Sequence, residues 1–210
     1  VSIDLKGPLP MAAGSGSCYI LSIMDCFSRF YIAIPIQSKH AHVVVDALVT
    51  YHLTVFPVPT TLVSDNGTEF CNTVMTSLAE QYGFTKRFTP VVHQQSNQVE
   101  RVHRTLGHTL KMYCQAHGHR VWPRVLHLFC NAYNNTPMTG IGLSPMEIVF
   151  CRPPSHPAQM TLPTSDSHLF PNSLEDHVKA SERRRKDLHL LLREMNKKLQ
   201  WRNKQAYNKN

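Results

Sequence analysis

The order of its short β-rich runs and helical repeats constrains the fold of this 210-residue chain more than any other feature. Three β-rich runs, at residues 1–5, 18–24 and 30–36, are joined by turns and predict an antiparallel meander. Residues 41–56 then carry apolar side chains at helical spacing, and residues 61–64 form a fourth apolar run. The chain therefore opens with three strands, a helix and a fourth strand.

Helices dominate the chain after the fourth strand. The pattern predicts a helix at 70–82, a fifth strand at 85–88, a polar loop at 89–97, and helices from Gln98 onward, at 121–133 and at 144–150. This order predicts an α/β fold with a mixed five-stranded sheet flanked by helices. A right-handed crossover should bring the fourth strand into the same sheet, where it can lie parallel to the first.

Composition divides the chain into a globular core at 1–151, a linker at 152–172 and a helical tail at 173–210. The linker holds five of the 14 prolines, whereas the tail has neither Gly nor Pro and begins with a capping sequence at Ser173. We therefore expect one long helix over 173–207. Because the chain begins at Val1 within an apparent strand, we expect it to be a fragment of a longer polypeptide.

The positive charge is concentrated in the tail. The chain has a formal net charge of +8, and the residues from Glu175 onward carry +6 of it. The run RRRK at 183–186 is typical of a DNA-binding or nuclear-import patch, but it is equally typical of a solvated helical face. The tail thus indicates a polyanionic partner without identifying it.

Two further features of the sequence bear on the class of protein. No apolar run approaches the roughly 20 residues that span a bilayer, and the N-terminus lacks the layout of a signal peptide, so we expect no membrane partner. Six cysteines are scattered without a CxxC pair. This favours buried free thiols over disulfides, although it does not exclude the latter.

Three acidic residues stand where they can meet. Asp4 lies near the end of the first strand, Asp65 follows the fourth, and Glu100 falls in the first turn of the helix after the fifth. Clustered carboxylates repel unless a cation neutralises them, and a pair of Mg²⁺ ions on such oxygens suits attack on a phosphodiester. The alternative is that all three are solvated acids at strand ends and a helix N-terminus, and spacing alone does not decide.

Five segments carry a resemblance to a known family. They are VSIDLKGPLP at 1–10, YILSIMDCFSR at 19–29, LVSDNGTEF at 62–70, HQQSNQVER at 93–101, and AYNNTP at 132–137 followed by LSP at 143–145. In this order they resemble the integrase cores of gypsy-type LTR retrotransposons and, more broadly, of retroviruses.

The resemblance implies an RNase H-like fold with Asp4, Asp65 and Glu100 as catalytic acids and ligands of two Mg²⁺ or Mn²⁺ ions. It further implies trimming of element DNA ends, their transfer into double-stranded target DNA, a homo-oligomeric assembly and a nuclear location. We expect the three carboxylates to lie on the order of 4–8 Å apart without metal, given the spacing of two-metal sites.

The loop before Glu100 departs from the family pattern. Gln94 replaces a proline and no glycine separates Asn97 from Gln98, so 34 residues lie between Asp65 and Glu100, one fewer than usual. The apolar face of the following helix shifts together with Glu100, so the loop can absorb the loss. The shortening nevertheless keeps open a catalytically decayed module that binds DNA or protein. A nuclease acting on RNA is a weaker alternative, because the matches after Glu100 are those of integrases.

Several polar residues are candidates for DNA contact. On the helix after the loop these are the basic residues Arg101, Arg104 and Lys111, and elsewhere they are Asn66, Gln94, Asn97 and Gln98. An ion pair between Glu100 and Arg104 explains part of this pattern equally well, and polar loop residues are commonly just solvated.

Overall fold

The computed structural model describes residues 1–88, 98–151 and 174–207. Within its helices some side chains, that of Glu100 among them, lie outside the description. The chain forms two compact units, residues 1–134 and 135–210, and each is considered by itself.

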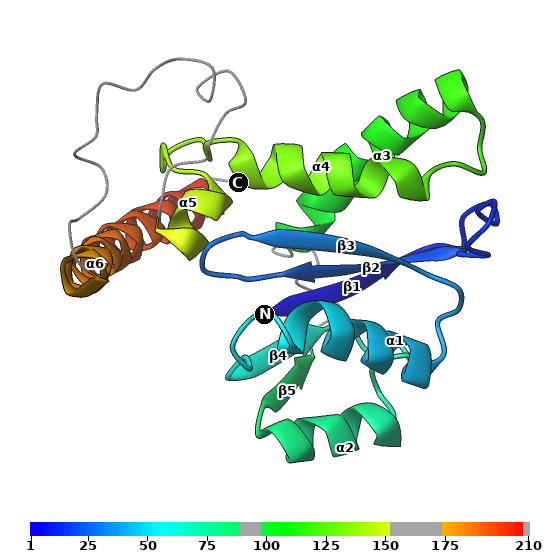
Figure 1. The fold of residues 1–210 in the computed structure, drawn as a ribbon, viewed down its shortest axis with the longest axis horizontal. Coiled ribbons are helices and arrows are strands. Elements are labelled where there is room, and N and C mark those ends of the chain that lie inside the picture. Colours follow the sequence, from blue (N-terminus) through cyan, green and yellow to red (C-terminus); the bar gives the residue numbers. More distant parts are fainter. Residues whose placement is uncertain (89–97, 152–173, 208–210) are drawn as a thin grey trace. The chain divides into compact units, whose positions relative to one another are not determined.

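The first unit contains a five-stranded mixed sheet (Figure 1). Its strands are β1 (Ser2–Lys6), β2 (Tyr19–Met24), β3 (Tyr31–Ile36), β4 (Thr61–Ser64) and β5 (Thr85–Phe88), in the order β3-β2-β1-β4-β5. The first three pair antiparallel, as the meander predicted, whereas β4 pairs parallel with β1 and β5 parallel with β4. The predicted fold class and the predicted place of the fourth strand are both confirmed.

Helices cover both faces of the sheet (Figure 1). On one face, α1 (Ala41–Leu48) and α2 (Thr73–Tyr82) join a buried cluster that includes Ile3, Leu21, Ile23, Val44 and Met75. On the other, α3 (Gln98–His117) and α4 (Pro123–Asn135) join a second cluster that includes Ile20, Met24, Tyr31, Leu106 and Trp122. Alternate residues of the strands face opposite layers, as the pleat of a sheet requires.

Two helices differ from the sequence prediction. The helix expected at 41–56 is regular only to Leu48 and continues as a π-helix, η1 (Val49–Leu53), because the N–H of Thr54 reaches back five residues to the carbonyl of Val49. The helix expected to begin at 70 begins at Thr73, because the side chain of Asn72 accepts a hydrogen bond from the N–H of Met75 and caps it.

Two further expectations need correction. The helix expected at 121–133 runs from Pro123 to Asn135, with proline at its first position and the indole N–H of Trp122 donating to the carbonyl of Pro10 at 2.8 Å. The expectation that all cysteines are buried is wrong for Cys26 and Cys71, which are exposed. Both stand in turns outside the strands and helices, where apolar neighbours do not enclose them.

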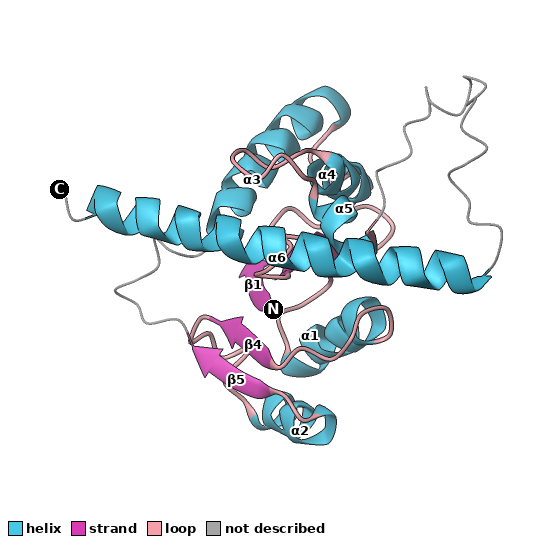
Figure 2. Cartoon of the chain, turned by 90° about the vertical axis from the view of Figure 1, so that its left-hand side faces the viewer, coloured by secondary structure: helices cyan, strands magenta, loops and turns pink. Residues whose placement is uncertain are grey.

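The second unit contains α5 (Pro145–Phe150) and α6 (Leu174–Tyr207). Ser144 and Glu147 form a reciprocal capping box at the start of α5. The long helix predicted in the tail is confirmed as α6, which is uninterrupted over 34 residues (Figure 2). Its predicted cap at Ser173 and the predicted linker at 152–172 lie outside the described residues. None of the described helices has the length and apolar character to cross a membrane.

Candidate active site

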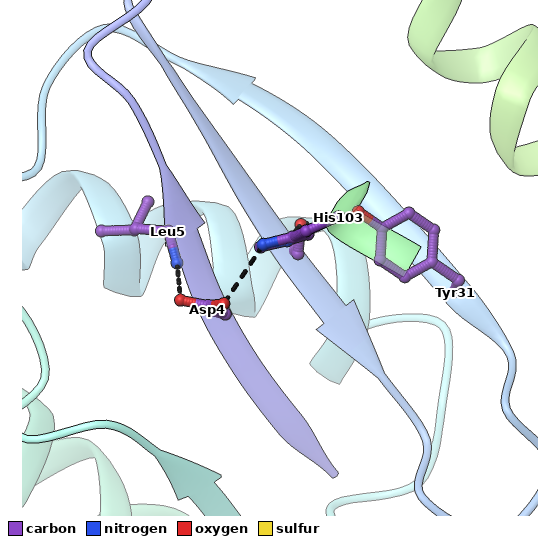
Figure 3. A network of polar contacts seen from close by, with 5 residues as sticks. Asp4, Leu5, Tyr31 and His103 are labelled. Carbon is purple, nitrogen blue, oxygen red and sulfur yellow. Dashed lines mark hydrogen bonds and ion pairs between the residues drawn. The ribbon is translucent and has the colours of Figure 1, made fainter. Parts of the chain in front are cut away.

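Asp4 faces the α3 side of the sheet. Its neighbour Ile3 is buried in the cluster under α1 and α2, so the next side chain along β1 points the opposite way. The carboxylate of Asp4 accepts the backbone N–H of Leu5 on Oδ1 at 2.8 Å and lies with Oδ2 3.2 Å from Nδ1 of His103 on α3 (Figure 3). Asp4 is therefore held by its own strand and by the helix that covers it.

A chain of buried polar groups continues from His103 into the sheet. Nε2 of His103 contacts the hydroxyl of Ser22 on β2, and this hydroxyl lies 2.7 Å from the phenol oxygen of Tyr31 on β3. All three side chains are buried, at 8%, 0% and 0% exposure for His103, Ser22 and Tyr31. Burial raises the pKa of Tyr31 far above its ordinary value of 10, so the phenol keeps its proton and can donate it.

Asp65 lies in the turn that follows β4 and is exposed. Its Oδ1 accepts the N–H of Gly67 at 3.0 Å, which fixes the side chain against the turn. A Cβ at position 67 would stand 2.9 Å from Oε1 of Glu69 and 3.0 Å from Oδ1 of Asp65. Two carboxylates therefore converge on the space that glycine leaves free.

The register of the parallel strands brings Asp4 and Asp65 to the same level. Ser2 of β1 pairs with Val63 of β4, and each acid lies two residues further along its own segment. Neighbouring strands are about 4.8 Å apart, so the backbones of β1 and β4 lie side by side where Ser2 faces Val63, two residues before each acid. The meeting of the Asp4 and Asp65 carboxylates stays a prediction, with which this register is consistent.

Glu100 lies in the first turn of α3, and only its backbone is described. His103 follows it by three residues, a rise of about 4.5 Å along a helix. Because His103 touches Asp4, the Glu100 backbone lies about one helical turn from that contact. Among the described side chains no group of three His, Cys, Asp or Glu residues could hold a metal ion. The predicted separation of the three carboxylates stays a prediction, since it depends on Glu100.

The candidate DNA contacts divide into three groups. Arg101, Arg104 and Lys111 are exposed along α3, and Asn66 is exposed beside Asp65. Gln98 is placed only by its backbone, and Gln94 and Asn97 lie outside the described residues. The described members therefore offer accessible basic groups on α3 and an accessible amide next to Asp65 in the chain, and their contact with DNA stays a prediction.

Sequence reasoning missed His103, Ser22 and Glu69. A signal for the first exists: His103 interrupts the apolar face of α3 formed by Val102 and Leu106, and it stands one turn after Glu100. For Ser22 the signal is weaker, because a serine inside an apolar strand commonly satisfies its hydroxyl locally. No pattern in the sequence predicts that Glu69 approaches Asp65.

Known proteins match both the sequence and the fold. The family model for the integrase core domain matches residues 1–93. A Pol polyprotein from transposon 412 of Drosophila melanogaster is 27% identical over 99% of this chain, and the koala retrovirus Gag-Pol polyprotein is 34% identical over 80% of it. The chain spans only 16% and 10% of the length of these two relatives.

Two solved structures share the fold. The BIV integrase catalytic core domain is 25% identical with a TM-score of 0.55, covering 70% of this chain and 90% of that one. The HTLV-2 integrase catalytic core domain, solved in complex with magnesium in a trimeric form, is 13% identical with a TM-score of 0.54, covering 70% of this chain and 92% of that one. From the family match, the polyprotein relatives and the RNase H-like sheet together, this chain carries a retroviral-type integrase catalytic core.

Proposed function

We propose that this chain is the catalytic core of a DNA integrase that trims the 3′ ends of an element's DNA and joins them to target DNA. The observation that carries the proposal is the parallel register of β1 and β4, in which Asp4 and Asp65 each follow the facing pair Ser2 and Val63 by two residues. The helix that bears Glu100 contacts Asp4 through His103. The polyprotein relatives support integration in general, and a gypsy-type element is the narrower source that we propose.

The oxygen atoms of this site fit a hard divalent cation. Asp4 uses each carboxylate oxygen for one contact, with Leu5 and with His103, and a carboxylate oxygen has a further lone pair to offer. Asp65 is exposed in the turn that follows β4. We propose that Asp4, Asp65 and Glu100 hold two Mg²⁺ or Mn²⁺ ions. Bound ions of this kind supply positive charge to a phosphate and lower the pKa of an attacking hydroxyl.

The remaining residues of the site suit the binding of DNA. Arg101, Arg104 and Lys111 are exposed on α3, where they can contact phosphates and so place the scissile bond beside the acids. Asn66, Gln94, Asn97 and Gln98 are proposed to contribute further contacts. Double-stranded DNA is thus the proposed substrate, a homo-oligomer the proposed assembly and the nucleus the proposed location.

A second candidate is a non-catalytic DNA- or protein-binding module that derives from an integrase. The shortened segment between Asp65 and Glu100 favours it, because a loop that positions substrate has lost one residue. Both candidates bind the same partners, so an assay of chemistry is needed to separate them.

The test is a strand-transfer assay with labelled DNA ends and Mg²⁺ or Mn²⁺. We expect Asp65→Asn to abolish cleavage and joining while the fold remains, since removal of one charge from an acid cluster relieves repulsion. The matched control is Asp46→Asn, which makes the same change at an exposed position of α1, under the opposite face of the sheet. Products from the Asp65→Asn variant, or none from the unmodified chain, would overturn the catalytic proposal.

A further inference from the structure

We propose that His103 is a positioning residue that orients the carboxylate of Asp4 for the cation, and that the buried hydroxyls of Ser22 and Tyr31 hold its imidazole in place. This inference rests on the proposed function, since it assigns a role at the same metal site. His103 touches neither DNA nor metal in this role; it acts through Asp4.

The imidazole has a separate partner for each nitrogen. Nδ1 lies 3.2 Å from Oδ2 of Asp4 on β1, while Nε2 contacts the hydroxyl of Ser22 on β2. Figure 3 shows the nitrogen of His103 that faces the carboxylate of Asp4, joined to it by a dashed line. The ring can therefore not rotate about its bond to Cβ without losing both contacts.

The directions of the hydrogen bonds that link Asp4, His103, Ser22 and Tyr31 follow from the carboxylate of Asp4. An ionised carboxylate only accepts, so Nδ1 of His103 carries the proton that is shared with Asp4. In a neutral imidazole Nε2 then accepts from Ser22, and the Ser22 hydroxyl in turn accepts from Tyr31, whose phenol lies 2.7 Å away. Each of these four groups therefore has one consistent role as donor or acceptor toward its neighbour, and each hydrogen bond fixes the orientation of the next group.

This arrangement leaves Asp4 with a defined orientation. Oδ1 is held by the N–H of Leu5 and Oδ2 by His103, so neither oxygen can swing away from the sheet surface. A metal ligand that is oriented in advance loses less entropy on binding, and partners that orient a ligand commonly contribute about 10- to 100-fold to metal affinity.

The competing explanation is a core histidine that is satisfied by Ser22 alone and lies beside Asp4 without consequence. Two substitutions separate the explanations because each keeps one contact. In His103→Asn the amide nitrogen stands near the place of Nδ1 and can still donate to Asp4, whereas Ser22 loses its contact with residue 103 and keeps only Tyr31. In His103→Gln the longer side chain reaches the place of Nε2 and keeps Ser22, whereas Asp4 loses its donor.

The experiment measures Mn²⁺ binding to the 210-residue chain without DNA, by the electron paramagnetic resonance signal of the free ion. We expect His103→Gln to weaken Mn²⁺ binding about tenfold and His103→Asn to stay within about twofold of the unmodified chain. Thermal unfolding is recorded for both variants, since a merely structural role would lower the melting temperature without this difference in affinity. If His103→Gln does not fold, Ser22→Ala, which frees the ring at Nε2, is expected to weaken binding at least threefold.

The outcomes also separate this inference from the proposed function. The Mn²⁺ affinity of Asp65→Asn serves as the reference for a chain that has lost a ligand of the proposed metal site. Equal Mn²⁺ affinity of the two His103 variants, with Asp65→Asn still impaired, would overturn the positioning role and leave the proposed function standing. Mn²⁺ binding that Asp65→Asn does not change would overturn the proposed function together with the inference.

Discussion

The side chain of Asn134 on α4 brackets the backbone of Tyr31 on the edge strand β3. Its Oδ1 accepts the N–H of Tyr31 at 2.9 Å, and its Nδ2 donates to the carbonyl of the same residue at 2.8 Å. β3 is the outermost strand on this side of the sheet, so these backbone groups have no strand to pair with. One amide therefore takes the place of a neighbouring strand at this position, where an open edge would otherwise invite pairing with other chains.

Replacing this amide should destabilise the fold. Asn134→Ala leaves a buried N–H and a buried carbonyl of Tyr31 unpaired, and each such group costs about 1–3 kcal/mol. We expect the free energy of unfolding in urea to fall by about 2–4 kcal/mol, compared with less than about 0.5 kcal/mol for His127→Ala at an exposed position of the same helix. Similar values for the two variants would mean that the bracket contributes nothing to stability.

Acid should destabilise the first unit through His52. This residue is 5% exposed and packs on Phe56 with ring centroids 5.4 Å apart, and burial lowers its pKa below the ordinary 6.5. As the pH falls below about 6.5, His52 binds a proton in the unfolded chain but not yet in the folded chain, so the free energy of unfolding decreases. This decrease ends once the pH has fallen below the lowered pKa of the folded state. His52→Phe keeps a ring there and should show a smaller loss between pH 7.5 and 5.

Urea unfolding at these two pH values measures the effect. His127→Gln is the control, since it removes an exposed histidine and should leave the pH dependence unchanged. An unaltered pH dependence in His52→Phe would assign the acid sensitivity to other groups.

The cysteines should divide into two classes of reactivity. Burial raises the pKa of Cys130 to about 11 and also raises that of Cys114, whereas Cys26 and Cys71 are exposed. At pH 8 roughly one thiol in a thousand is ionised when the pKa is 11, and the thiolate is the form that reacts. Mass spectrometry after brief iodoacetamide treatment should find label on Cys26 and Cys71 first, and on Cys114 and Cys130 only in urea. Equal labelling of all four in the folded chain would contradict this assignment.

The basic run on α6 should contribute salt-sensitive affinity for DNA. Arg183, Arg184, Arg185 and Lys186 are all exposed, and each phosphate contact contributes about 0.9 to the slope of log affinity against log salt. Changing all four to glutamine should weaken binding to duplex DNA and reduce this slope in a titration followed by fluorescence anisotropy. In the control, Lys39 and Arg124, which are exposed on other parts of the chain, are likewise changed to glutamine. An unchanged slope in the fourfold variant would show that this run is only solvated.

The predicted and observed bounds of the helices show which features the sequence can locate and which it cannot. Apolar spacing identified α3, because that spacing follows from the repeat of the helix itself, whereas the absence of Gly and Pro identified α6. The start of α2 was missed by three residues, because Asn72 caps the helix only once its side chain has turned back to Met75. The break after Leu48 was missed because a π-turn has no apolar period of its own.

The sequence by itself determined the order of strands and helices and the position of Asp65 directly after the fourth strand, since both follow from local periodicity and turn residues. Asp4, which was expected near the end of the first strand, is instead the middle residue of β1. Only the tertiary structure decided that His103 lies against Asp4 and that Asn134 brackets Tyr31. These contacts join residues 99 and 103 positions apart, and which polar side chain on a helix meets which strand depends on how the layers pack. A periodic pattern tells which face of a helix is buried, but the identity of the partner is set by the element that lies opposite.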